Sequence, residues 1–137
     1  MPATSFRCDV HLHSEQSGGA LSVTENTMPA GAPGPPLHRH DFDEAFYVLE
    51  GALTFQVEDA LITAGPGEFA FAPRGVAHTL ANQTGEPARY LLLCTPAGFE
   101  RVLARRMAAQ AGEDPPAWAL ADGPEVVVVG PRIGERA

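Results

Sequence analysis

The stretch that decides the fold is HRHDFDEAFYVLEG, residues 38–51, in which polar side chains lead directly into an alternating apolar run. His38, His40 and Glu44 are separated by even numbers of residues, so in an extended segment without a bulge they point to the same side. Phe46 continues that parity and makes it the interior side of a strand. Two imidazoles and a carboxylate on a buried face are costly unless a partner such as a divalent cation binds them.

A fourth donor is expected from a neighbouring strand. The candidate is His78, because PRGVAHTLAN, residues 73–82, places it after a Pro and Gly turn on an otherwise apolar run. Three imidazoles and one carboxylate suit Fe, Mn, Ni, Co or Zn, and they leave coordination positions open for water or substrate. The residue types therefore predict one divalent transition metal ion of undetermined identity, bound by His38, His40, Glu44 and His78. The alternative is a set of polar residues at a strand end that bind no metal.

The same residues resemble the two motifs of the cupin superfamily. The first motif is histidine, any residue, histidine, three or four residues, glutamate, six residues and glycine, and it matches His38, His40, Glu44 and Gly51. The second motif matches completely, at Gly67, Pro73, Gly75, His78 and Asn82. One position departs from the pattern, because Ala32 stands where the first motif begins with glycine.

The resemblance implies an all-β fold, a single small jelly-roll-like β-barrel (double-stranded β-helix) that holds the metal inside and carries a C-terminal helix. The amino-acid sequence around the motifs is most similar to that of single-domain cupins related to quercetin dioxygenase. By this resemblance the chain is expected to be a metal-dependent oxygenase acting on an enolisable or aromatic small molecule, with Glu44 as metal ligand and catalytic base. Two alternatives stay open: a Lewis-acid cupin of the isomerase or polyketide cyclase type, and a cupin that binds a small molecule without catalysis.

Gly and Pro recur at short intervals, which indicates many short strands joined by turns. We expect strands at residues 20–28, at 67–75, at 89–94 with both faces buried, and on either side of Gly51 between residues 44 and 59. The two strands beside Gly51 are expected to pair as a hairpin, and Glu58 and Asp59 then turn the chain into the next strand. Residues 29–36, PAGAPGPP, can only be a loop.

After residue 94 the apolar period becomes helical, with Phe99, Val102, Leu103 and Met107 on one face. The pattern predicts a helix over residues 97–110, with Thr95 as N-cap, Pro96 at the first helical position and an end near Gly112. This helix is expected either to cover the outer face of the barrel or to form a lid. A short helix is expected in PPAWALA, residues 115–121, and a strand in EVVVVG, residues 125–130. We therefore assign residues 1–96 to the barrel and residues 97–137 to a helix and tail that pack on the same domain.

Aromatic side chains on the expected strands are candidates for the wall of a substrate pocket. The candidate pocket residues are Phe46, Val48, Phe55, Phe69 and Phe71. The alternative is plain barrel core, and both descriptions can hold, because the core of a small barrel becomes the pocket wall near its open end. Arg74 is a candidate for holding a substrate anion, although PRG before a strand is first of all a turn.

Composition narrows the possible partners. The chain has 137 residues and a formal net charge of −8, which fits one domain and argues against nucleic acid and anionic membranes as partners. The N-terminus lacks the features of a signal peptide, and no run approaches 18 apolar residues, so we expect a cytoplasmic protein. A small-molecule substrate and a homodimer are expected, the latter through edges of the N-terminal strand and the EVVVV tail.

The remaining cysteines and histidines give weaker signals. Cys8 and Cys94 lack CxxC spacing, and we interpret them as buried free thiols. His11 and His13 repeat the spacing of His38 and His40, but no glutamate follows in matching register. We therefore expect them to be edge-strand histidines rather than ligands.

Overall fold

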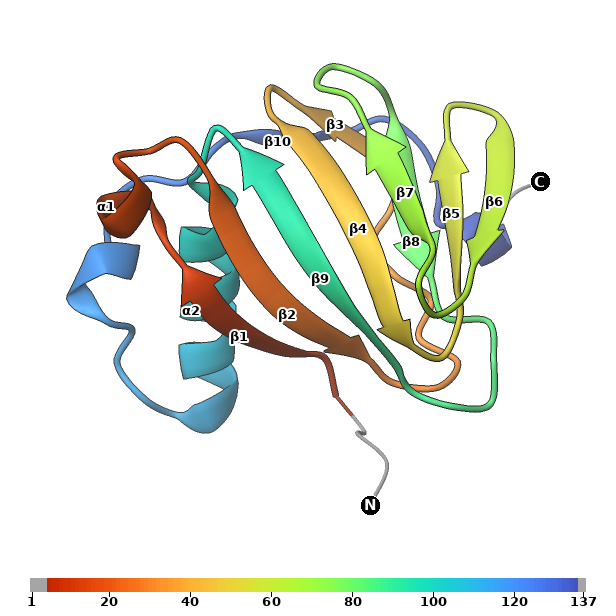
Figure 1. The fold of residues 1–137 in the computed structure, drawn as a ribbon, viewed down its shortest axis with the longest axis horizontal. Coiled ribbons are helices and arrows are strands. Elements are labelled where there is room, and N and C mark those ends of the chain that lie inside the picture. The colour runs from red at the N-terminus through yellow and green to blue at the C-terminus, as the bar shows by residue number, and fades with distance from the viewer. Residues whose placement is uncertain (1–4, 136–137) are drawn as a thin grey trace.

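Residues 5–135 form two antiparallel sheets of five strands each in the computed structural model, which describes this part of the chain (Figure 1). The order in the first sheet is β1 (Arg7–Leu12), β2 (Ser22–Met28), β9 (Ala88–Thr95), β4 (Asp43–Glu50) and β7 (Phe69–Ala72). The order in the second sheet is β10 (Val126–Val128), β3 (His38–His40), β8 (His78–Ala81), β5 (Leu53–Val57) and β6 (Ala60–Ala64). The predicted strand-rich class is confirmed as two antiparallel sheets with one longer helix. The strands hydrogen-bond as two separate sheets, so the predicted closed barrel stays a prediction.

The helical elements are short apart from one. They are α1 (Ser14–Ser17), α2 (Phe99–Ala111) and two 3-10 turns, η1 (Ala117–Ala119) and η2 (Ile133–Glu135). Within residues 5–135 no helix is long and apolar enough to cross a membrane. The sequence-based assignment divided the chain into residues 1–96 and 97–137. Residues 1–4 and 136–137 of these two segments lie outside the described residues.

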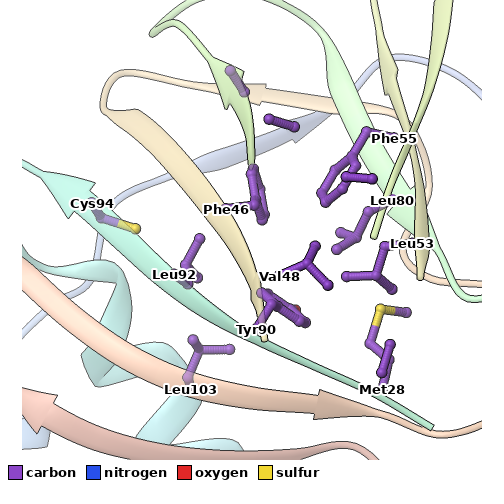
Figure 2. Packing of buried hydrophobic residues seen from close by; sticks show 14 of the residues in the cluster. Met28, Phe46, Val48, Leu53, Phe55, Leu80, Tyr90, Leu92, Cys94 and Leu103 are labelled. Carbon is purple, nitrogen blue, oxygen red and sulfur yellow. The ribbon is translucent and has the colours of Figure 1, made fainter. Parts of the chain in front are cut away.

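The core lies between the inner faces of the two sheets. Figure 2 shows Phe46, Val48, Tyr90 and Leu92 of the first sheet opposite Phe55 and other apolar side chains of the second. Along β9, alternate residues from Ala88 to Cys94 are buried, while the residues between them are only half-buried. The prediction that residues 89–94 are buried on both faces is therefore wrong, because this sheet packs against the core with one face.

The hairpin predicted around Gly51 is also wrong. β4 pairs with β7 and β9, whereas β5 pairs with β6 and β8, so the chain passes from one sheet to the other at Gly51. Gly51 has φ of +75°, and a Cβ there would lie 2.6 Å from the carbonyl oxygen of Pro87. The turn predicted at Glu58 and Asp59 does form, since Val57 pairs with Ala60 in a β5–β6 hairpin.

The predicted C-terminal helix forms, but it begins later than expected. Thr95 is the last residue of β9 and pairs with Asp43, so it cannot cap a helix, and α2 begins at Phe99 with Gly98 as N-cap. The end is as predicted, with Gly112 as C-cap in the left-handed region at φ 69°. The helix packs against β1 and β2, beside the inner face of the first sheet (Figure 1).

The C-terminal tail joins the second sheet. The strand expected in residues 125–130 is β10, and it pairs antiparallel with β3 so that Val126 lies opposite His40 and Val128 opposite His38. The short helix expected in residues 115–121 is the 3-10 turn η1. A segment far along the sequence thus lies beside the strand that carries two of the candidate ligands.

Candidate metal centre

The four residues predicted as ligands come together in one cluster. His38, His40, Glu44 and His78 each offer one ligand atom, and these atoms all lie within 4.8 Å of one another. His40, Glu44 and His78 are buried, at 5%, 4% and 2% exposure. Both the residue types and the spacing therefore fit a three-histidine, one-carboxylate metal site.

The side chains reach the cluster from two sheets rather than from one extended face. His38 and His40 lie on β3 of the second sheet, whereas Glu44 lies on β4 of the first, because the chain turns at Asp41 and Phe42. The ring of Phe42 stacks on that of His40 with centroids 3.6 Å apart. The parity argument identified the right residues, but the inner faces of two sheets, not one strand, bring them together.

Backbone carbonyls fix the orientation of all three rings. The Nδ1 hydrogen of His38 is donated to the carbonyl oxygen of Pro36 at 2.7 Å. His40 donates in the same way to Phe42 at 3.0 Å, and His78 to Val76 at 2.9 Å. Because a carbonyl only accepts, each neutral ring carries its proton on Nδ1 and leaves Nε2 free as a ligand atom.

The free ligand atoms crowd one point. The Nε2 atoms of His40 and His78 lie 3.1 Å apart, and Nε2 of His78 lies 3.0 Å from Oε1 of Glu44. Nε2 of His40 also contacts this oxygen. With both rings neutral, two imidazole lone pairs and a carboxylate oxygen face one another and repel unless a proton or a metal cation lies between them, so the donor set fits a divalent metal ion.

The electrostatics favour an anionic Glu44. Burial by itself would raise the pKa of this carboxyl, but the hydrogen bonds and charges that His40 and His78 supply when a proton rather than a metal ion occupies their Nε2 atoms outweigh burial and hold the pKa at about 2. For His38, burial lowers the pKa, with a contribution from the neighbouring His78. For His78, burial acts in the same direction, but the hydrogen bond to Glu44 outweighs it, so the pKa is raised. At neutral pH, Glu44 therefore supplies the site with a negative charge.

A cavity of about 680 Å³ opens beside the cluster, and His38, Glu44 and His78 form part of its wall. Phe46 also lines this cavity, as predicted for a pocket residue. Val48 and Phe55 are 0% and 2% exposed and belong to the core behind the wall. Val48 and Phe55 are therefore core residues and not residues of the pocket wall.

Phe69 and Phe71 do not line the cavity, and their prediction as pocket residues is corrected. They are 68% and 49% exposed, because the parity of β7 turns Ala70 and Ala72 inward instead. Phe69 pairs with Tyr47, which is also exposed, on the outer face of the first sheet. In the run FAFA either the two Phe or the two Ala side chains could face the interior. Only the pairing of β7 with β4 decides which of the two sets is buried.

Sequence reasoning missed several residues of the cavity wall. The helix α2 contributes Phe99, Val102, Leu103 and Arg106, and β10 contributes Val126 and Val128. Helical spacing identified most of the α2 positions as an apolar face, but nothing in the sequence indicated which surface that face would cover. The helix predicted as a lid or an outer cover is thus part of the cavity wall.

Three other candidates have partners elsewhere. Nε2 of His11 lies 3.3 Å from a carboxylate oxygen of Glu25, and the ring of His13 stacks on Trp118 with centroids 4.2 Å apart. Arg74 forms an ion pair with Asp43 at 3.2 Å, outside the cavity wall. These contacts agree with the expectation that His11 and His13 are not ligands of the cluster, and they leave Arg74 no position facing the cavity.

Comparisons with known proteins agree with this description. Residues 25–94 match the family described as Cupin domain. The solved structure of the polyketide cyclase RemF from Streptomyces resistomycificus is 26% identical, with a TM-score of 0.59, over 69% of this chain and 68% of that one. The DMSP lyase DddQ from Ruegeria pomeroyi is 27% identical, with a TM-score of 0.57, over 66% of this chain but only 47% of that one.

A more distant structure shows the same fold. A predicted oxalate decarboxylase from Thermotoga maritima is 20% identical, with a TM-score of 0.61, over 66% of this chain and 80% of that one. No curated protein sequence matches this chain. These neighbours are described with different activities, so the shared architecture does not select one reaction.

Proposed function

This chain belongs to the cupin superfamily, and from that premise we propose that it is a metal-dependent oxygenase of the quercetin dioxygenase-like type. Its substrate would be an enolisable or aromatic small molecule that is largely apolar. The observation that carries the proposal is the position of the cluster, since His38, Glu44 and His78 face a 680 Å³ cavity whose wall is otherwise mainly apolar. Cavities of this size and character enclose most of a small organic ligand.

The ligand set suits the chemistry. A redox-active ion bound by His38, His40, Glu44 and His78 would supply a Lewis acid and electrons for dioxygen. Oε1 of Glu44 contacts both His40 and His78, whereas Oε2 makes no hydrogen bond that the structure shows among residues 5–135. We infer that Oε2 takes the proton of the enolisable group, while the apolar wall holds the ring system and excludes water.

Metal analysis and oxygen uptake test the proposal together. Protein purified without added metal should contain Fe, Mn, Co or Ni near one ion per chain, and it should consume dioxygen with an enolisable aromatic compound. In Glu44→Gln, the three histidines should retain most of the metal while turnover falls by about 10²-fold or more, because the base is lost. Turnover that persists in this variant with metal bound would remove the role of Glu44 as base.

A second candidate is a Lewis-acid enzyme that catalyses cyclisation or isomerisation without dioxygen. The 26% identity to RemF, described as a polyketide cyclase, favours it. Turnover without oxygen uptake, supported equally well by Zn, would identify this class. Tight binding without turnover across the same compounds would instead indicate a binding protein.

A further inference from the structure

A second polar point lies inside the cavity, away from the metal centre. Asn26 on β2 and Tyr90 on β9 are paired across the first sheet, and both side chains line the cavity wall. They are 1% and 3% exposed, and Figure 2 shows Tyr90 among Val48, Leu92 and Leu103. Polar groups in such surroundings normally have all of their hydrogen-bonding atoms paired.

This pair is incompletely satisfied. The side-chain amide of Asn26 donates to the hydroxyl oxygen of Tyr90 at 3.4 Å, while Oδ1 of Asn26 has no partner. The Tyr90 hydroxyl makes no second hydrogen bond that the structure shows among residues 5–135, so its own hydrogen is available. A hydroxyl placed beside them can donate to Oδ1 of Asn26 and accept from Tyr90, which satisfies both groups at once. A rotated amide would also find a partner in it, because a hydroxyl both donates and accepts.

The register of the sheet gives the separation of the pair from Glu44 along the strands. Tyr90 lies beside Val48 on β4, four residues beyond Glu44, which corresponds to about 13 Å along the strand. The inward residues of the intervening row are Phe46 and Leu92, and both line the cavity. The wall thus has a metal-ligand cluster, an apolar middle and a buried polar pair in sequence along the sheet.

We propose that Asn26 and Tyr90 recognise a hydroxyl group at the end of the substrate remote from the metal. The substrate class is then a ring system of two or more rings that carries an oxygen ligand at one end and a hydroxyl at the other. Burial keeps the Tyr90 phenol protonated, since it raises the pKa of Tyr90, so Tyr90 acts as a donor. The inference rests on the proposed function for the metal-bound end only, and it makes Asn26 and Tyr90 specificity-determining residues.

The test uses two pairs of probes of different length on the metal-loaded protein. One pair is 2,3-dihydroxynaphthalene and 2,3,6-trihydroxynaphthalene; the other is 3-hydroxyflavone and its 4′-hydroxy derivative. In each pair the first compound carries the metal-binding group alone, and the second adds a remote hydroxyl. Calorimetric titration should show about tenfold tighter binding of the hydroxylated member in at least one pair, as expected for a good buried hydrogen bond.

The variants separate this contact from a general effect on the cavity. Asn26→Leu and Tyr90→Phe should each reduce the ratio of affinities for the two members of a pair to below about twofold. Thr24→Val is the matched control, because Thr24 is a buried polar residue on the same strand that does not line the cavity, and the ratio of affinities should stay as in the wild type. Equal binding of both members in both pairs, a ratio that survives in both variants, or no binding of any probe would overturn the proposal. Metal content and oxygen uptake are measured separately, so failure of the proposed oxygenase activity is distinguished from failure of this contact.

Discussion

The Nε2 atoms of His40 and His78 lie 3.1 Å apart, although both rings donate their Nδ1 hydrogen to backbone carbonyls. The two lone pairs therefore face each other in a site where both side chains are almost completely buried. Without a cation the two lone pairs repel each other, whereas a cation bound between them is attracted to both. Metal binding and the stability of the fold should consequently be coupled.

We expect removal of the metal by a chelator to lower the melting temperature. An ion present at a hundred times its dissociation constant stabilises the folded state by about 2.7 kcal/mol, which corresponds to roughly 8–10 °C for a domain of this size. His78→Ala should lose the metal and show no chelator effect, whereas His11→Ala, which alters a histidine outside the cluster, should behave like the wild type. Differential scanning calorimetry with elemental analysis checks this, and an unchanged chelator effect in His78→Ala would contradict it.

Glu100 at the start of α2 is expected to be a major stabilising residue. It is 1% exposed and accepts hydrogen bonds from the backbone and hydroxyl of Ser14, at 2.6 and 2.5 Å, and from the backbone of Gly98, at 2.6 Å. Glu100→Ala leaves these three donors without a partner and should lower the free energy of unfolding by about 2–4 kcal/mol. Urea denaturation provides the measurement. The exposed Glu113→Ala should change it by less than about 0.5 kcal/mol, and equal effects of the two variants would refute the assignment.

Stability should fall on the alkaline side. Burial raises the pKa of the Cys8 thiol from 9.0 to about 12 and raises the pKa values of Cys94 and Tyr90 as well. Between pH 9 and about 12 the unfolded chain loses these protons while the folded chain keeps them, so the free energy of unfolding decreases as pH rises. Denaturation at pH 8, 9.5 and 10.5 should show the decline, and Cys8→Ala should make it less steep. A variant slope identical to that of the wild type would argue against the contribution of Cys8.

We expect the protein to be a homodimer, now through the outer face of the first sheet rather than through the edges of the N-terminal strand and the EVVVV tail, because the exposed aromatic side chains lie on that face. Tyr47, Phe69 and Phe71 are 41%, 68% and 49% exposed there and form one apolar patch across β4 and β7. Ion pairs flank both ends of β4, Asp43 with Arg74 and Glu50 with Arg89. Because the charges at each end are already paired within the chain, a copy related by a two-fold axis can cover the patch without leaving an unpaired charge, and a second copy is the partner we expect.

Light scattering coupled to size exclusion tests this interface. The double variant Phe69→Asp with Phe71→Asp should be monomeric and should retain its metal, because neither side chain reaches the cavity. Leu61→Asp changes an apolar residue that is 54% exposed on β6 of the other sheet and should leave the dimer intact. A monomeric wild-type protein would rule out the expected dimer. Dissociation by the Leu61 variant alone would instead place the interface on the second sheet.

The metal cluster was predictable from the sequence because its information is local. The spacing of His38, His40 and Glu44, with His78 in a second motif, identified all four residues that the structure brings within 4.8 Å. Ala32 replaces the glycine with which the first motif begins, but this replacement has little effect on the loop. The position at which the loop requires glycine is Gly34, where a Cβ would lie 1.7 Å from the carbonyl oxygen of Leu80. Close packing of this loop against β8 thus depends on Gly34.

The sequence-based predictions of strand pairing and side-chain orientation were wrong where they depend on pairing between strands that are distant in the sequence. The hairpin around Gly51 was a local inference, but β4 forms its hydrogen bonds with β7 and β9 instead. Phe69 and Phe71 were assigned to the pocket on residue type, whereas the register with β4 turns them outward. A shift of one residue in register exchanges the two faces of a strand, and no pattern within FAFA excludes either face.

By itself, the sequence determined the ligand types, the strand-rich class and the helix that follows the last long strand, because composition, parity and period are properties of short segments. Only the tertiary structure decided which sheet each strand joins, which surface α2 covers and that β10 returns to lie beside β3. It also decided that Asn26 and Tyr90 share the cavity with the metal ligands, although Tyr90 follows Asn26 by 64 residues. Contacts of this kind arise from the burial of inner faces against each other, a condition satisfied only when the whole chain is packed.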